Sequence, residues 1–390
     1  MPKYIRKTFT YNGKRYEVRG NTEREAFEKL GDLKAAVKRG EVGISSKMTV
    51  NAWSEEWLKT YVRPRVRKAG EPKRRNTMTE KSYSTYTDKL NLYILPVIGY
   101  MRIADVKDTH LQKILNKQAG QSFSTASKIK NVMTAMFRQA YASRIIQFDP
   151  STNLTLPATT TKKRRSLTED ERKVLLKVAE THRCGLWIRT LLRTGMRPAE
   201  SAALLVSDLD FDKNLIHVSK AVESGTKVIS TPKTDAGNRY IPIPKDIRED
   251  LKCAVKQKKP SDYVFPQTDG TSMMTSACID NNWAKFARQM DLEMGALTTV
   301  HGHIYDPKDL FPDGTPKYPD KDGNPINGHK LDQSLTLYDL RHTYATDLAR
   351  NKIPIDVAKT FLGHSSITMT ADIYNHFGDA DDASEYVDSV

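Results

Sequence analysis

The segment ATTTKKRRSLTEDE, residues 158–171, most constrains how this chain folds. Apart from one alanine and one leucine it is polar or charged, so it offers no apolar face to a core. We interpret residues 158–166 as a linker between separately folded parts. Ser166 with Glu169 three residues later has the spacing of a capping box, which predicts that a domain opens with a helix near residue 167.

Positive charge is concentrated before this linker. The net charge is +15, yet residues 1–150 hold 30 Lys and Arg against 14 Asp and Glu, and the remaining residues hold 32 against 33. The asymmetry favours a front half that binds nucleic acid and a back half with another task. Charge alone leaves open a basic surface that only keeps the protein soluble.

The rest of the composition excludes several classes of protein. Hydrophobic residues make up 38% of the chain and charged residues 28%, as in globular proteins, and no run of 18 apolar residues is present to span a membrane. The first residues lack an apolar signal core, so we expect a cytoplasmic protein. Three widely separated cysteines argue against a disulfide framework or a zinc site, and we expect neither a metal nor a cofactor.

Residues 1–46 predict a small ββα domain. Two runs rich in Tyr, Thr and Val flank Asn12-Gly13, a strong signal for a β-hairpin. Thr22 then precedes a helical pattern that ends near Gly40. A β-ribbon fits the major groove of DNA, although a hairpin that is merely solvated explains the pattern nearly as well.

Residues 47–157 predict an all-helical domain. Helices are expected from about residue 50, and over 79–95, 108–118 and 124–142. A basic loop with prolines and a glycine separates the first two. We expect basic residues of the hairpin, this loop and the linker to contact DNA. They are Lys14, Arg15, Arg19, Arg65, Arg67, Lys73, Arg74, Arg75, Lys162, Lys163, Arg164 and Arg165.

The third domain, residues 167–390, holds the residues best suited to chemistry. In LLRTGMRPAE a Thr-Gly pair ends one helix and a proline opens the next. Arg197 therefore lies at a helix N-terminus, where an anion is stabilised. Glu200, one turn later, is placed to orient it or simply to cap the helix. Strand-like runs follow, with Lys233 in a turn, so we expect mainly helices with a small antiparallel sheet. Taken alone, a turn lysine is more often a solvated surface residue.

Three further polar residues follow in order. Arg341 lies in LTLYDLRHTYATDL, whose apolar spacing predicts a half-buried helix. A buried arginine needs a carboxylate or a phosphate as its partner. His364 follows a Leu-Gly pair, where we expect another helical turn to begin, and Tyr374 comes ten residues later.

The order of these motifs resembles the tyrosine recombinase (phage integrase) family, as found in conjugative transposons and temperate phages. The motifs are Thr-Gly-Met-Arg-Pro-Ala-Glu, a hairpin lysine, Leu-Arg-His-Thr, Leu-Gly-His and a late tyrosine. The resemblance of the catalytic part covers roughly residues 165–377. By layout, the helical unit resembles the family's core-type DNA-binding domain, and the ββα unit its arm-type DNA-binding domain.

The resemblance implies a role for each residue. Tyr374 would attack a DNA phosphodiester and form a 3′-phosphotyrosyl link, without metal or ATP. Arg197 and Arg341 would bind the non-bridging oxygens, Lys233 would protonate the leaving oxygen, and His364 would donate a hydrogen bond to the phosphate. Tyr338 stands where the family commonly has a histidine, which leaves the general base open, because a phenol is a poor base at neutral pH.

The resemblance also implies what the protein acts on and assembles with. It predicts a site-specific recombinase that integrates or excises a mobile element. Its partners would be double-stranded DNA at core and arm sites and three further copies in a tetramer, with an excisionase or DNA-bending protein as a further candidate. A type IB topoisomerase and a catalytically silent DNA-binding protein are the alternatives.

Two segments of the third domain stand apart. Residues 294–334 are dense in Pro, Gly and Asp, and Asp313-Gly314 and Asp322-Gly323 are turn signals, so we predict a protruding β-hairpin insertion that contacts DNA or another protomer. The tail, residues 378–390, is acidic with a few apolar residues. We expect it to dock on a neighbouring subunit or on its own, or else to be a frayed terminus.

Overall fold

The computed structural model describes residues 4–11, 14–38, 48–71, 74–159, 165–223, 225–230 and 235–374. The chain divides into two compact units, of which the second consists of residues 163–390 together with 69–73. The fold is mainly helical with small antiparallel sheets. In the described parts of the chain, no helix has the length and apolarity needed to cross a membrane.

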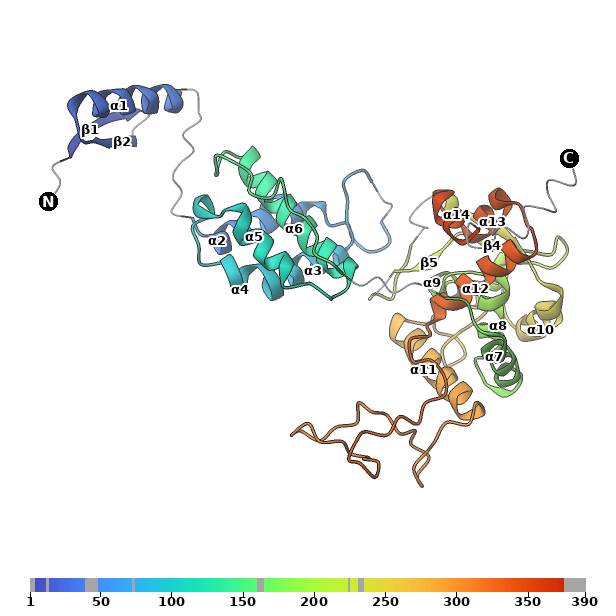
Figure 1. The fold of residues 1–390 in the computed structure, drawn as a ribbon. Coiled ribbons are helices and arrows are strands. Elements are labelled where there is room, and N and C mark those ends of the chain that lie inside the picture. The colour runs from blue at the N-terminus through green and yellow to red at the C-terminus, as the bar shows by residue number, and fades with distance from the viewer. Residues whose placement is uncertain are drawn as a thin grey trace, which may run out of the picture. The chain divides into compact units, whose positions relative to one another are not determined.

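The first 38 residues contain a ββα element. Strands β1 (Ile5–Tyr11) and β2 (Lys14–Gly20) pair antiparallel from Ile5↔Gly20 to Tyr11↔Lys14, and they lie along one side of α1 (Glu23–Lys38) (Figure 1). The helix begins at Thr22, whose hydroxyl accepts a hydrogen bond from the Glu25 amide at 3.2 Å. Apolar residues of α1 pack on the ribbon, so this short segment has a core of its own.

A helical bundle follows. Its α-helices are α2 (Val50–Trp57), α3 (Glu80–Lys89), α4 (Leu95–Ile98), α5 (Asp108–Asn116) and α6 (Phe123–Ala142). Single π-helical turns, Leu58–Val62 and Leu90–Ile94, continue α2 and α3. The Trp53 indole, which is buried, donates to the Met136 carbonyl at 3.2 Å and ties α2 to α6. The basic loop between α2 and α3 is fixed at its base by the Arg65 guanidinium, which donates to the Asn76 carbonyl.

The second unit surrounds small sheets with helices. Its helices are α7 (Glu169–Thr181), α8 (Gly185–Thr194), α9 (Pro198–Ala202), α10 (Lys245–Val255), α11 (Ser276–Glu293), α12 (Leu337–Arg350), α13 (Ile355–Leu362) and α14 (Thr368–Tyr374). Strands β3 (Leu209–Asp210), β4 (Leu215–Val218) and β7 (Arg239–Pro242) form one antiparallel sheet, and β5 (Ala221–Val222) pairs with β6 (Ile229–Ser230). Buried residues of α8, β4, β7, α11 and α12 join in one core.

The predicted cap of the first helix in this unit is wrong by two residues. The N-cap is Thr168, which exchanges two hydrogen bonds with Glu171. Ser166 instead hydrogen-bonds the Thr346 hydroxyl at 2.7 Å. Both positions fit the capping pattern, and the contact with α12 decides between them.

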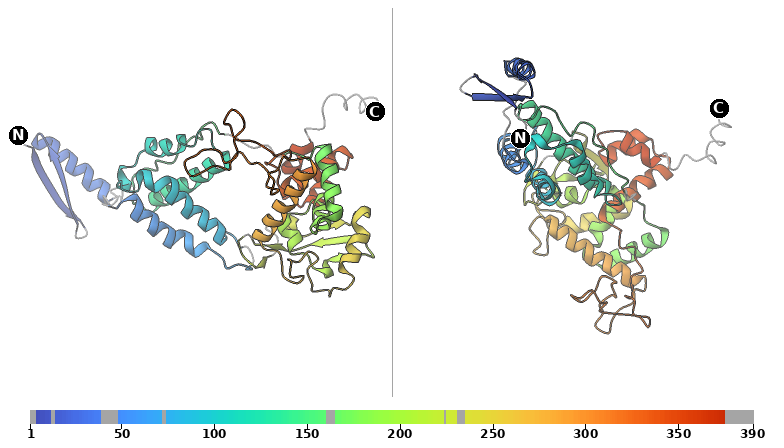
Figure 2. Two further views of the ribbon diagram at one scale, coloured as in Figure 1. Left: turned by 90° about the horizontal axis from the view of Figure 1, so that it is seen from below. Right: turned by 60° about the vertical axis from the view of Figure 1, so that its left-hand side comes forward.

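The predicted β-hairpin at residues 294–334 is also wrong, although its turns are present. This range, which the structure describes in full, contains three successive bridged turns and no strand. The bridges are Thr298↔Ile304, Leu310↔Pro316 and Pro319↔Pro325. Each turn has a glycine at positive φ, Gly302, Gly314 and Gly323. Prolines at three of the six bridging positions cannot donate to a ladder, so the segment extends from α11 as an irregular loop (Figures 1 and 2).

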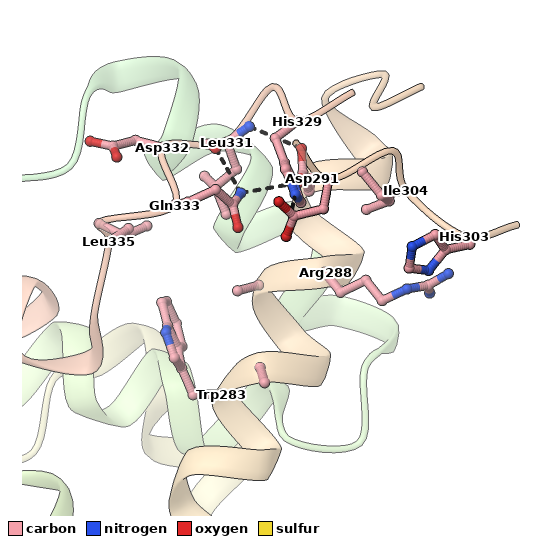
Figure 3. A pocket seen from close by; sticks show the side chains of 13 residues that line it. Trp283, Arg288, Asp291, His303, Ile304, His329, Leu331, Asp332, Gln333 and Leu335 are labelled. Carbon is pink, nitrogen blue, oxygen red and sulfur yellow. Dashed lines mark hydrogen bonds and ion pairs between the residues drawn. The ribbon is translucent and has the colours of Figure 1, made fainter. Parts of the chain in front are cut away.

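A buried carboxylate anchors the returning end of this loop to α11. Asp291 accepts hydrogen bonds from His329 Nδ1 at 2.6 Å and from the backbone amides of Lys330 and Leu331 at 2.7 and 2.9 Å. Beside it lies a cavity of about 340 Å³, which Trp283 and other residues of α11 line together with the loop (Figure 3). None of the predicted catalytic residues that the structure describes lines this cavity.

Candidate active site

Four of the predicted catalytic residues lie in helices of the second unit or directly beside their ends. Arg197 is the N-cap of α9, two residues after the αL cap Gly195 that ends α8. Arg341 lies in α12, one turn after its first residues. His364 follows the αL cap Gly363 of α13, and Tyr374 is the last residue of α14. Lys233 lies outside the described residues.

Three guanidinium groups converge on the C-terminal end of α13. Arg239 Nε donates to the Phe361 carbonyl at 2.8 Å, Arg341 Nη2 to the Leu362 carbonyl at 2.5 Å, and Arg197 Nη2 to the Gly363 carbonyl at 3.2 Å. The last carbonyls of a helix have no partner within it and carry its negative partial charge. The backbone carbonyls at the end of α13 therefore bring three cations close together.

Arg239 is the member of this cluster that the sequence did not identify. It lies in β7, where Arg239 and Ile241 are buried and alternate with exposed residues. A charged residue at an inward position of a strand was the available signal, because a buried charge is costly unless a partner compensates it.

Glu200 is that partner. The side chain is almost completely buried, and its two carboxylate oxygens accept from Arg239 at 3.2 and 2.9 Å. The same carboxylate accepts from Arg197 Nη1 at 2.6 Å and from the Arg197 backbone amide at 2.8 Å. Burial raises the pKa of Glu200, but the hydrogen bonds and charge of Arg239 and the charge of Arg197 outweigh it and hold the pKa below its ordinary value.

Arg341 is deeply buried, and the partners of its guanidinium are backbone carbonyls. Besides the Leu362 carbonyl, it donates to the Gly195 carbonyl at 2.7 Å. Burial, with the nearby charge of Arg197, lowers the pKa of Arg341 to about 9, so it is still a cation at neutral pH. Three arginines and one glutamate give the cluster a net charge of +2, which an anionic group would compensate.

His364 is buried beside the arginines. Its Nδ1 lies 3.0 Å from the Thr370 hydroxyl, and the residue occupies the turn between α13 and α14, so the expectation that it begins a helical turn is wrong. Burial and the charges of Arg341, Arg197 and Arg239 lower its pKa to about 4. The ring is therefore neutral at pH 7. If Thr370 donates to Nδ1, Nε2 carries the proton and is a hydrogen-bond donor.

We expect this histidine to make folding sensitive to acid. The unfolded chain takes up a proton near pH 6.5, whereas the folded chain resists protonation until about pH 4. Lowering the pH from 7 to 5 should thus remove about 2 kcal/mol of the free energy of unfolding at this residue. Thermal unfolding of wild type and His364→Gln at both pH values measures the difference, and an identical loss in the two proteins would contradict it.

The two tyrosines of the prediction differ in their surroundings. The Tyr374 hydroxyl donates to the Ile353 carbonyl, just beyond the end of α12, at 2.8 Å. Partial burial raises the pKa of Tyr374. Tyr338 is 43% exposed in the first turn of α12, three residues before Arg341, so the two lie on neighbouring positions of one helical face.

The basic residues predicted to contact DNA differ in their exposure and in their partners. Arg15, Arg19, Arg65, Arg74 and Arg75 are exposed and Arg67 is partly exposed. The side chain of Lys14 and all of Lys73, Lys162, Lys163 and Arg164 lie outside the described residues. Arg165 donates to both oxygens of Glu171 at 2.6 and 2.7 Å and to Asp332 at 3.1 Å, so its role here is to hold the start of α7. In the part of the chain that the structure describes, no group of three His, Cys, Asp or Glu side chains could hold a metal.

Sequence comparison places the chain among recombinases. The pattern of the phage integrase family matches residues 165–304 and 326–380, and that of the phage integrase central domain matches residues 65–156. A tyrosine recombinase XerC-like protein of Caldanaerobacter subterraneus subsp. tengcongensis is 26% identical over 96% of this chain and 92% of its own length. The transposase from transposon Tn916 of Enterococcus faecalis is 26% identical over 90% of this chain and 79% of its own.

The fold is similar to that of a solved integrase. The integrase of transposon Tn1549, solved in complex with a circular intermediate DNA, superposes with a TM-score of 0.66 at 20% sequence identity. The similarity covers 88% of this chain and 99% of that structure. The similarity in sequence to the XerC-like protein covers 96% of this chain, and the similarity in fold to the Tn1549 integrase covers 88%.

Proposed function

Because this chain belongs to the phage integrase family, we propose that its cation cluster binds the scissile phosphate of a DNA strand and that Tyr374 attacks it. The protein is a tyrosine recombinase, an enzyme that cuts and rejoins DNA strands. The observation that supports these residue roles most directly is the convergence of Arg197, Arg341 and Arg239 on the end of α13, with Glu200 as the carboxylate among them.

The proposed step exchanges one phosphoester for another. The Tyr374 hydroxyl gives up its proton to a base or to water as its oxygen forms a bond to phosphorus, the bond from phosphorus to the 5′ oxygen breaks, and that oxygen takes up a proton. The energy of the ester is kept in the 3′-phosphotyrosyl link, so a free 5′ hydroxyl can reverse the reaction on another strand. Neither hydrolysis nor a nucleotide takes part.

The charges match what this transition state requires. The pentacovalent phosphate is more negative than the ground state, and fixed cations at this position stabilise it more strongly than they stabilise the bound DNA. Arg197 and Arg341 donate to the non-bridging oxygens, His364 donates from Nε2, and Lys233 supplies the proton for the leaving oxygen. Tyr338, exposed beside Arg341, hydrogen-bonds the phosphate.

Tyr374 must change its hydrogen bond before it attacks. Its hydroxyl donates a hydrogen bond to the Ile353 carbonyl at 2.8 Å. Attack therefore requires that the hydroxyl leave Ile353 and approach a phosphate held by the arginines.

Membership of the family supports a proposal for the partners. We propose that the exposed arginines of the ββα element and of the basic loop bind double-stranded DNA at arm and core sites, in the cytoplasm. Strand exchange between two duplexes requires two cuts in each, which four copies of the chain would provide. An excisionase or a DNA-bending protein would direct excision of the mobile element. The comparisons do not favour a type IB topoisomerase or a silent DNA-binding protein.

A DNA substrate with a nick just beyond the cleavage site tests this function. Once the strand is cut, a short fragment diffuses away and the covalent adduct accumulates. We expect an adduct at one sequence, with the DNA attached to the peptide that contains Tyr374, as read by mass spectrometry. Adducts at many sequences would indicate a topoisomerase, and DNA binding without adduct would indicate a silent binder.

A further inference from the structure

We propose that Arg239 is a positioning residue of the active site: it does not touch DNA, but it fixes Glu200 and the end of α13 and thereby places Arg197 and His364. This inference rests on the proposed function for the reaction it serves. Its basis is the set of contacts made by a buried guanidinium that none of the proposed steps uses.

Arg239 is turned fully inward. Its side chain is 2% exposed. It makes four hydrogen bonds: two to Glu200, one to the Phe361 carbonyl at 2.8 Å and one to the Gly237 carbonyl at 3.2 Å. A guanidinium with this burial and this many partners is not available to a phosphate. Its effect must therefore pass through the groups that it holds.

Each of these groups adjoins a residue proposed for catalysis. Glu200 holds Arg197 by both its backbone amide and its guanidinium. The Phe361 carbonyl is followed by the two carbonyls that accept from Arg341 and Arg197, and then by His364. Arg239 thus joins Glu200 to the end of α13 from the buried side, whereas Arg197, which contacts the same two groups, is 34% exposed.

The charge balance gives Arg239 a second effect. Glu200 pairs with two arginines, so its charge neutralises Arg197 only in part, and Arg197 can still attract a phosphate. Without Arg239 the whole carboxylate would face Arg197, and the cluster would fall from +2 to +1. Arg197 would then be held more tightly by Glu200 and would stabilise added negative charge less well.

Gly363 shows how closely Arg239 and α13 approach. The glycine has φ +65°, and a Cβ there would lie 2.9 Å from Arg239 Nη1 and 2.8 Å from the Ala236 carbonyl. Only glycine allows both this conformation and this contact. The residue directly before His364 is therefore packed on Arg239.

Two substitutions separate charge from geometry. Arg239→Lys keeps the charge but cannot reach Glu200 and Phe361 together, and Arg239→Met removes both. We expect each to slow single-turnover adduct formation about 100-fold while DNA affinity changes less than about threefold. Arg248→Met is the control, because Arg248 also donates to a carbonyl of this unit, that of Phe211, away from the cluster. It should react like wild type.

Coupling distinguishes positioning from general damage. Because Arg239 is proposed to act through Arg197 and His364, the double variant with Arg197→Ala and Arg239→Met should be slowed much less than the product of the two single effects. Additive losses, or single variants as fast as wild type, would overturn the proposal. Because Arg239→Met leaves the buried Glu200 with one cation fewer, the same comparison is made with Glu200→Gln added, which removes the carboxylate charge.

A measurement without catalysis keeps this inference separate from the proposed function. His364 is followed by NMR titration of the free protein. Its midpoint should rise by about one pH unit in Arg239→Met, because one of three neighbouring cations is lost, and stay near the wild-type value in Arg239→Lys and Arg248→Met. An unchanged midpoint in Arg239→Met would show that Arg239 does not reach His364, whether or not the protein forms an adduct with DNA.

Discussion

Replacing Tyr374 with phenylalanine should abolish the covalent protein–DNA adduct and leave DNA affinity unchanged. The substitution removes one oxygen, the proposed nucleophile, and no other group of the chain carries its role. The hydroxyl donates a hydrogen bond to the Ile353 carbonyl, so its loss should cost only about 1 kcal/mol of the free energy of unfolding. Adduct is measured on the nicked substrate and affinity on the intact site.

The control is Tyr240→Phe. Tyr240 lies in β7, is 56% exposed and stacks on His217, so the same oxygen is removed elsewhere in the same unit. This variant should form adduct at the wild-type rate. Residual adduct in Tyr374→Phe at even a hundredth of that rate would mean that another residue carries the DNA.

Substituting Gly195 with alanine should destabilise the second unit by more than about 3 kcal/mol, or lower its melting temperature by about 10 °C. Gly195 ends α8 in the left-handed conformation, with φ +62°. A residue with a side chain adopts this conformation at a cost of about 1–2 kcal/mol. An added Cβ would also lie 2.3 Å from Cδ1 of the Tyr344 ring. That ring is partly buried, and burial raises the pKa of its hydroxyl to about 12, so the added methyl group must displace it from its packed position.

Gly270→Ala separates the two causes. Gly270 has φ +77°, but a methyl group added there would meet no atom within 4 Å, so alanine at this position should cost only the conformational part. The loss in the double variant Gly195→Ala with Tyr344→Ala should be smaller than the sum of the two single losses, because the overlap is removed. Equal melting temperatures for Gly195→Ala and Gly270→Ala would refute the steric argument.

The sequence predicted the catalytic motifs better than their surroundings. Arg197, Arg341 and His364 were predicted from their order in motifs, and the structure brings them together. Arg239 was missed because its importance depends on Glu200, 39 residues earlier, and on a helix end more than 120 residues later. Local periodicity can mark an inward arginine but cannot name its partner.

The other differences have the same origin. Ser166 and Thr168 both satisfy the capping pattern, and only the contact with Thr346 on α12 selects Thr168 as the cap. In residues 294–334 the glycines at Gly314 and Gly323 gave the turns correctly. The flanking prolines prevented the ladders that a hairpin needs. Turns depend on local residues and can be predicted from the sequence, whereas strand pairing depends on the hydrogen-bond donors of both strands.

The way α13 ends restricts how this enzyme can change during evolution. Its last three carbonyls, not their side chains, seat Arg239, Arg341 and Arg197, so the chemistry places no demand on the side chain of Phe361. Inserting one residue into α13 would have a larger effect than a substitution, because it would turn those carbonyls by about 100° about the helix axis. All three arginines would lose these hydrogen bonds at once. We therefore expect this helix to vary in composition far more readily than in length.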